Sequence, residues 1–75
     1  MPGKTLADLR RSPKHVTYRE LLGVLVEHGW NVREGTLHGA IVQKNARTFL
    51  VPRAHGSHLL PVYVRRVVRM IEEED

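Results

Sequence analysis

Apolar residues recur along this 75-residue chain with two periods, one typical of helices and the other of strands. A spacing of three and four residues over 17–29 predicts a helix with one buried face. Thr17 and Glu20 can form a capping box at its start, and Gly29 supplies the left-handed residue that ends many helices. The apolar residues of this face are Tyr18, Leu21, Leu22 and Leu25.

After this helix the pattern changes to the alternation of half-buried strands. Asn45 separates the last two runs and can adopt the positive φ of a tight hairpin turn. A proline, Pro52, ends the third run. The three predicted strands span residues 30–34, 38–43 and 47–51.

A second helix is predicted over 61–73, because Pro61 suits the first helical position, where a backbone N–H has no intrahelical partner. A helix, three antiparallel strands and a helix predict an α+β fold in which both helices cover one face of the sheet. The other face stays open to solvent, as in double-stranded-RNA-binding domains. The apolar stripe of the second helix is Val64, Val67, Val68 and Ile71.

The length of the chain leaves room for one small domain, which we assign to residues 17–73. Residues 1–16 contain two prolines and a glycine around a possible helical turn, which Thr5 and Asp8 could cap. We expect this segment to be a loosely docked arm. Residues 74–75 are the end of an acidic tail.

Charge is distributed unevenly along the chain. Lys and Arg number 12 and Asp and Glu number 8, which gives a net charge of +4. Four of the acids are the last four residues, so residues 1–71 carry twelve bases against four acids, a net charge of +8. Such an excess suits a polyanion, and nucleic acid is the commonest one in a cytoplasm. The terminal EEED run would lie at a helix C-terminus, where the dipole disfavours negative charge, so we expect it to fray.

The chain contains no cysteine, so neither a disulfide nor a thiolate zinc site can support the fold. It also lacks an apolar run of membrane-spanning length and a secretory signal. We therefore expect a cytoplasmic protein with no membrane partner. His55 and His58 have no carboxylate or cysteine partner, and we expect no metal or other cofactor.

Four segments occur in a specific order: ELLGVLVEHGW, a glycine-led histidine motif, a hairpin strand that closes in VP, and the last helix YVRRVVRMIEE. Together they resemble the HicA family of bacterial toxins, the small mRNA interferases of HicAB toxin–antitoxin modules. The resemblance extends from about Leu6 to Glu73. It implies a metal-independent endoribonuclease that cleaves mRNA, and a HicB-type antitoxin that binds the toxin and covers its active site.

The histidine motif of the family is Gly-Ser-His, with Thr or Gly sometimes in the middle. In this chain Gly35 and Thr36 are followed by an additional residue, Leu37. Counted back from Pro52, His38 lies fourteen residues upstream, which is the separation usual in the family. The resemblance therefore assigns the catalytic histidine to His38.

A rival histidine occurs in the same chain. The letters GSH are present at residues 56–58, in the loop before the last helix, and they end in His58. The motif belongs at the start of the middle strand, beside the open sheet face, and this context favours His38. The family often has another histidine shortly after the strand-ending proline, and His55 could match it with a shift of one residue.

RNA contains its own nucleophile, the 2′-hydroxyl, so its cleavage needs a group that moves protons and cations that stabilise the phosphorane. Histidine changes its charge near neutral pH and suits the first role, while arginine suits the second. Contacts to phosphates would supply affinity that falls as salt rises. The candidate RNA-binding residues are Arg33, Lys44, Arg53, Arg65, Arg66 and Arg69.

Two other functions stay open at this point. One is a non-catalytic RNA-binding module that keeps the fold after losing the motif, which the additional Leu37 would explain. The other is a protein that serves chiefly as the partner-binding half of a complex, with little contact to nucleic acid. The few aromatic residues argue against a base-stacking platform that reads single strands.

Overall fold

The computed structural model describes residues 4–34, 37–53 and 58–74. It has the predicted α+β architecture, with one antiparallel sheet in the strand order β1-β2-β3. The elements in chain order are α1 (Leu6–Arg11), the 3-10 turn η1 (Pro13–His15), α2 (Tyr18–Glu27), β1 (Asn31–Arg33), β2 (Gly39–Lys44), β3 (Arg47–Pro52) and α3 (Pro61–Glu74).

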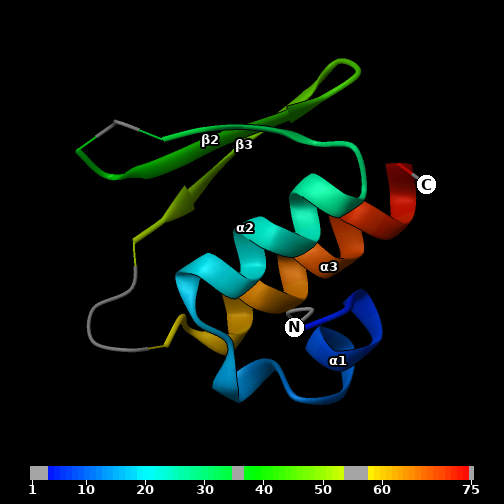
Figure 1. Ribbon diagram of the computed structural model, residues 1–75, viewed down its shortest axis with the longest axis vertical. Helices are drawn as coiled ribbons and strands as arrows, with labels where there is room; N and C mark the ends of the chain where they lie inside the picture. The colour runs from blue at the N-terminus through cyan, green and yellow to red at the C-terminus, as the bar shows by residue number, and fades with distance from the viewer. Residues whose placement is uncertain (1–3, 35–36, 54–57, 75) are drawn as a thin grey trace.

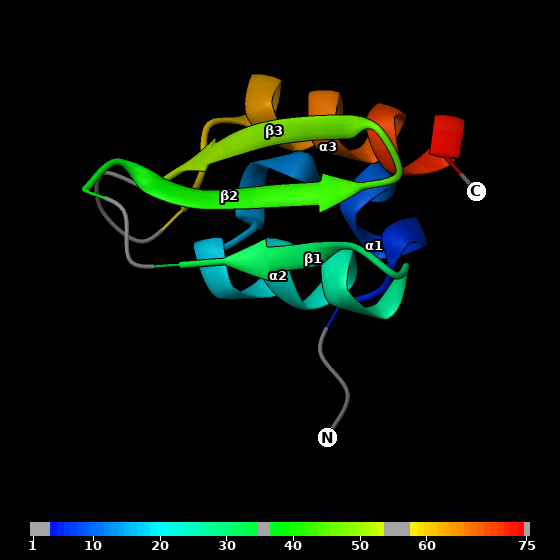
Figure 2. The same cartoon turned by 90° about the horizontal axis from the view of Figure 1, so that it is seen from above.

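The sheet has one buried and one exposed face, as the alternation of the strands predicts. Strand β1 pairs with β2 through Val32 and Val42, and the hairpin from β2 to β3 turns at Asn45 with φ 56°. Val42 is fully buried, whereas Ile41 and Leu50 are 37% and 44% exposed. Helices α2 and α3 cover the buried face and leave the other face open (Figures 1 and 2).

Local signals in the sequence place α2 and α3 close to the predicted positions. The Thr17 hydroxyl accepts the backbone N–H of Glu20 at 3.1 Å, and the Glu20 carboxylate accepts the N–H of Thr17 at 2.9 Å. Gly29 follows the last turn of α2 with φ 86°, in the left-handed region. The apolar stripes of both helices meet in one core, which contains Leu21, Leu25, Val64, Val67 and Ile71.

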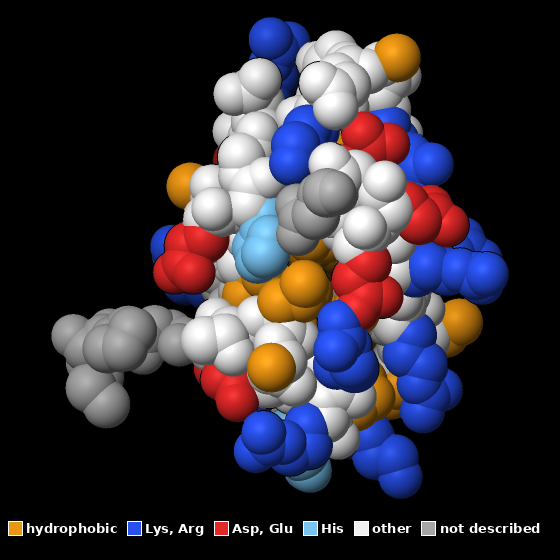
Figure 3. All heavy atoms as spheres, turned by 90° about the vertical axis from the view of Figure 1, so that its right-hand side faces the viewer, with side chains coloured by type: hydrophobic (Ala, Val, Ile, Leu, Met, Phe, Trp, Pro, Cys, Tyr) orange, Lys and Arg blue, Asp and Glu red, His pale blue; other side chains and the backbone are white. Residues whose placement is uncertain are grey.

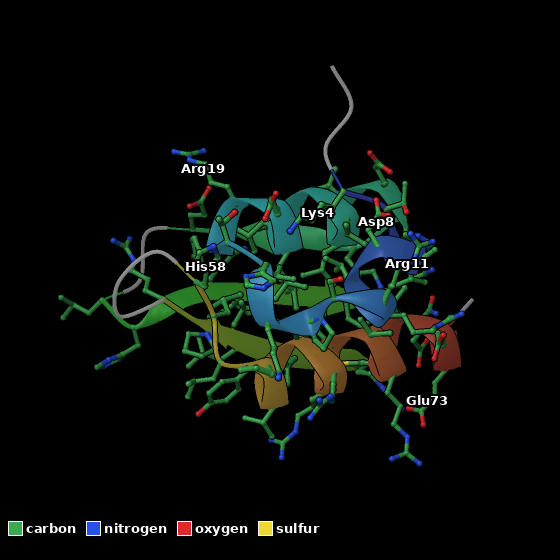
Figure 4. All side chains as sticks on the ribbon, turned by 90° about the horizontal axis from the view of Figure 1, so that it is seen from below. Lys4, Asp8, Arg11, Arg19, His58 and Glu73 are labelled. Atoms are coloured by element: carbon green, nitrogen blue, oxygen red, sulfur yellow. The ribbon has the colours of Figure 1, made fainter. Side chains whose placement is uncertain are left out.

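The N-terminal arm is packed into the fold, so our expectation of a loosely docked segment is wrong for its described part. A capping box of Thr5 and Asp8 starts α1, and η1 follows. Leu9 in α1 and Val16 after η1 have no exposed surface. These segments lie on the side of α2 and α3 that faces away from the sheet (Figures 1 and 4). They form a third layer, because Leu9 and Val16 belong to the same hydrophobic core as the buried residues of α2 and α3.

The acidic run at the C-terminus continues α3, so the expected fraying is also wrong. Glu72 forms an ion pair with Arg10 of α1. Glu73 accepts a hydrogen bond from the guanidinium of Arg47 in β3 at 2.7 Å. Nearby cations therefore compensate the unfavourable position of these carboxylates at the negative end of the helix dipole.

Candidate functional site

Several chain segments meet at one end of the molecule. Strands β1 and β3 end there, β2 begins there, and both α2 and α3 start there (Figures 1 and 2). We call it the His38 end, after the predicted catalytic residue that directly precedes β2. Both helices direct the positive ends of their dipoles toward it, which favours anions in this region.

His38 lies exposed at the start of β2. Its carbonyl oxygen accepts the backbone N–H of Arg53 at 3.1 Å, which extends the ladder by one step beyond the pair of Gly39 and Pro52. Arg53 is exposed as well. Leu37, the additional residue of the motif, is 92% exposed and takes up no space inside the fold. Two solvent-accessible residues, a histidine and an arginine, therefore oppose each other across two strands.

Gly39 fixes the backbone directly after His38. Its φ is +147°, and a Cβ atom at this position would lie 2.0 Å from the carbonyl oxygen of Val51. No other residue fits there unless β3 moves. From the sequence we emphasised Gly35 and Thr36, which lie outside the described residues, and we missed Gly39. Its signal is a glycine at a strand position, which often marks a close backbone approach.

The other two sheet residues predicted to bind RNA, Arg33 and Lys44, lie at different distances from His38. Arg33 is exposed in β1 and is in register with Ile41, near the His38 end. Lys44 ends β2 roughly 20 Å from His38, given the rise of an extended strand. The Nζ of Lys44 donates to the carbonyl oxygen of His28 at 2.8 Å, at the end of α2. One phosphate group therefore cannot contact both Lys44 and His38.

The three arginines of α3 belong to the helical side of the molecule. Arg65, Arg66 and Arg69 are all exposed. Arg65 and Arg69 line a shallow groove between α1 and α3. The Nε of Arg69 also lies 3.8 Å from a carboxylate oxygen of Glu73, one helical turn further on. These residues form a second basic surface, separate from the open face of the sheet.

The rival His58 lies in the segment before α3, at one end of the helix layer (Figure 4). Its ring meets the ring of His15 edge to face, with 5.9 Å between centroids and 83° between planes. The backbone N–H of Leu59 donates to the carbonyl oxygen of Val16 at 2.8 Å, which holds the two segments together. This histidine pair was not predicted, because its members are far apart in the sequence.

The hydroxyl of one tyrosine on α2 is buried inside the fold. The hydroxyl of Tyr18, the first residue of α2, is shielded from solvent and forms no hydrogen bond with the described residues. Burial raises the pKa of Tyr18, the carboxylate of Glu34 raises it further, and the guanidinium of Arg53 lowers it. The phenol therefore stays protonated at neutral pH. From the sequence we assigned Tyr18 to the core and did not anticipate an unpaired polar group there.

Comparisons with known proteins found no counterpart for this chain. No protein-family model matches it, and neither the curated proteins nor the solved structures gave a match. The resemblance to the HicA family therefore stays a prediction. Among the described residues, no three His, Cys, Asp or Glu side chains gather as ligands for a metal ion. No helix in this part of the chain is long and apolar enough to cross a bilayer.

Proposed function

We propose that this protein is an endoribonuclease of the HicA type, a toxin that cleaves mRNA with His38 as its acid–base residue. The observation that carries the proposal is the exposed His38 opposite Arg53 at the end of the sheet. An imidazole accepts and returns protons near neutral pH, and a guanidinium stabilises negative charge that develops on phosphate oxygens. These are the two functions that RNA cleavage requires.

The proposed reaction uses the ribose 2′-hydroxyl as the nucleophile. His38 removes the proton from this hydroxyl while the 2′-oxygen attacks the adjacent phosphorus. The O2′–P bond forms, the P–O5′ bond breaks, and the departing 5′-oxygen takes up a proton from water. The imidazolium of His38 returns its proton to the hydroxide that remains, which regenerates the neutral base. The products are a 2′,3′-cyclic phosphate and a free 5′-hydroxyl. Arg53 supplies positive charge to the phosphorane, which carries more negative charge than the substrate.

Binding of RNA in this proposal depends first on Arg33 and Arg53, which are the candidates on the strands nearest to the His38 end. An RNA chain that continues around the molecule would reach Arg65, Arg66 and Arg69 on α3. The open sheet face opposite two helices supports the finer assignment of a double-stranded-RNA-binding-domain-like fold. The proposed partner is a HicB-type antitoxin with an acidic surface that covers the His38 end and blocks access of mRNA.

Two histidine variants with the same chemical change test this proposal. Each of three proteins is incubated with a short RNA: wild type, His38→Ala and His58→Ala. The control substrate is the same RNA with a single 2′-deoxyribose at the cleaved position, which removes the nucleophile. We expect wild type and His58→Ala to produce a 2′,3′-cyclic phosphate from RNA alone. We expect His38→Ala to lose 10²-fold or more in rate, the usual contribution of a general acid–base residue. Mass spectrometry identifies the new ends.

Other outcomes distinguish the alternatives. Loss of cleavage in His58→Ala with full activity in His38→Ala would assign catalysis to the GSH sequence at residues 56–58. Wild type that binds RNA in a filter assay but never cleaves it would show a non-catalytic RNA-binding module. Wild type that neither binds nor cleaves RNA would contradict both readings and leave a partner-binding role.

A further inference from the structure

A shallow groove runs along the outer side of α2, between this helix and strand β1. Strand β1 is at the edge of the sheet, because the strand order is β1-β2-β3 (Figure 2). The groove is partly apolar and includes Val32 and Val26, the latter 58% exposed. Exposed apolar side chains next to a free strand edge are typical of a surface that binds another chain.

Gly23 lines this groove and lies in the middle of α2. Glycine is unfavourable inside a helix. Apart from its chain neighbours and the backbone of α2 itself, a Cβ atom at this position would meet no described atom within 4 Å. Packing within the monomer therefore does not require glycine. The missing side chain does allow the backbone of another helix to approach closely.

Two oppositely charged residues flank Gly23 at equal distances along the helix. Arg19 comes four residues before it and Glu27 four residues after it, and all three line the same groove. Both charged side chains are exposed, and neither forms an ion pair within the described part of the chain. Arg19 is directed away from the fold (Figure 4).

An antiparallel copy of this helix provides the matching charges. If a twofold axis passes through Gly23, Arg19 lies opposite Glu27 of the second copy, and Glu27 lies opposite Arg19 of the second copy. A surface that is complementary to itself is what a twofold dimer requires. The charge order and the central glycine therefore identify the occupant of the groove as the same chain.

We propose that this protein forms a homodimer in which two α2 helices pack antiparallel across Gly23 and the two β1 edges face each other. The dimer does not depend on the proposed ribonuclease activity. The surface of one small groove is limited, so dimerisation is weak and depends on protein concentration. Salt weakens it further, because the exposed charge pairs are screened.

Charge reversal on α2 tests the dimer by sedimentation velocity over a range of protein concentrations at low salt. We expect wild type to shift from monomer to dimer as its concentration rises. Arg19→Glu places two carboxylates opposite each other, and Glu27→Arg places two guanidinium groups opposite each other. We expect each single variant to weaken self-association by roughly tenfold or more.

Two further samples make the test specific for the antiparallel arrangement. An equimolar mixture of Arg19→Glu and Glu27→Arg restores both charge pairs in a heterodimer of the two variants. A protein that carries both substitutions restores them in its homodimer. Gly23→Leu is a control for shape, since leucine favours the helix but fills the groove. We expect it to be monomeric and to melt at a higher temperature than wild type.

The proposal is overturned if wild type remains a monomer at the highest concentration reached. It is also overturned if the mixture and the folded double variant both remain monomeric, because charge order would then play no part. A Gly23→Leu variant that dimerises as wild type does would place the interface elsewhere. Circular dichroism melts of every variant confirm that each one is folded.

Discussion

The basic side chains at the two ends of the sheet differ in whether they form ion pairs. At the hairpin end, which lies opposite the His38 end, Arg47 donates to Glu73 at 2.7 Å and lies 3.4 Å from Glu74. Figure 3 shows this side of the molecule, where acidic side chains lie among the basic ones. At the His38 end, Arg33 and Arg53 form no ion pair with any residue that the structure describes.

Because of this difference, the net charge does not show which basic side chains are accessible to a phosphate. A count along the sequence treats every arginine as equally able to bind a phosphate. In the fold, Arg10 and Arg47 form ion pairs with glutamates at the acidic end of α3, so each guanidinium would have to leave a carboxylate before it could contact a phosphate. Arg53 forms no ion pair with a described carboxylate. The comparison therefore separates the arginines held by carboxylates at the hairpin end from Arg33 and Arg53 at the His38 end, where the proposed RNA binding would take place.

The largest expected effect comes from the backbone at the His38 end. Gly39→Ala adds a methyl group where 2.0 Å separates the Cβ position from the carbonyl oxygen of Val51, and it does so at a φ of +147°. Overpacking and unfavourable backbone geometry together should lower the free energy of unfolding by about 3 kcal/mol or more. Urea denaturation followed by circular dichroism measures this loss.

Gly23→Ala is the matched control for this substitution. At Gly23, which is helical, the same methyl group would meet no described atom within 4 Å apart from its chain neighbours and the backbone of α2. We expect a gain in stability of about 1 kcal/mol, because alanine favours a helix. A similar loss of stability in both variants would contradict the close contact of Gly39 with β3.

A second prediction compares the two ends directly by RNA binding. Arg47→Ala removes one positive charge at the start of β3, and Arg53→Ala removes one directly after its end. The ligand is a 2′-O-methyl RNA, which cannot be cleaved. We expect Arg53→Ala to weaken binding on the order of tenfold at low salt, because a charged hydrogen bond to phosphate is lost. The slope of log affinity against log salt should decrease by about 0.7 to 1. Arg47→Ala should change neither quantity measurably.

Equal effects of the two substitutions would show that RNA affinity depends only on the overall charge of the protein. A larger effect of Arg47→Ala would reverse the assignment and place RNA at the hairpin end. Fluorescence anisotropy at several salt concentrations measures both affinity and slope in one experiment.

The parts of the fold that the sequence predicted depend on contacts within a few residues. The capping box of Thr17 and Glu20, the left-handed Gly29 and the hairpin turn at Asn45 each involve neighbours in the chain. Their residue types are restricted by local geometry, so the pattern of letters carries the information. The order of helices and strands followed from these signals and from the two apolar periods.

The parts that the sequence did not predict depend on contacts between distant residues. Leu9 is buried by a helix more than fifty residues away, and no local rule distinguishes it from an exposed leucine of an arm. The pairing of Arg47 with Glu73 and the meeting of His15 with His58 have the same origin. For the site, the sequence predicted an exposed His38 at a strand start, but not the steric need for Gly39 behind it.

The smallest expected effect concerns the ion pair at the hairpin end. The hydrogen bond from Arg47 lowers the pKa of Glu73 in the folded protein below its ordinary value of 4.5. A lowered folded pKa contributes stability that is present above the unfolded pKa and is lost as pH falls through the folded pKa. We therefore expect Glu73→Gln to be slightly less stable than wild type at pH 7, with the two proteins converging in strong acid. Urea denaturation across the acid range measures the difference, and an Arg47→Ala background should abolish it at every pH. A difference that persists in that background would mean that Glu73 acts through Arg69 rather than through the strand.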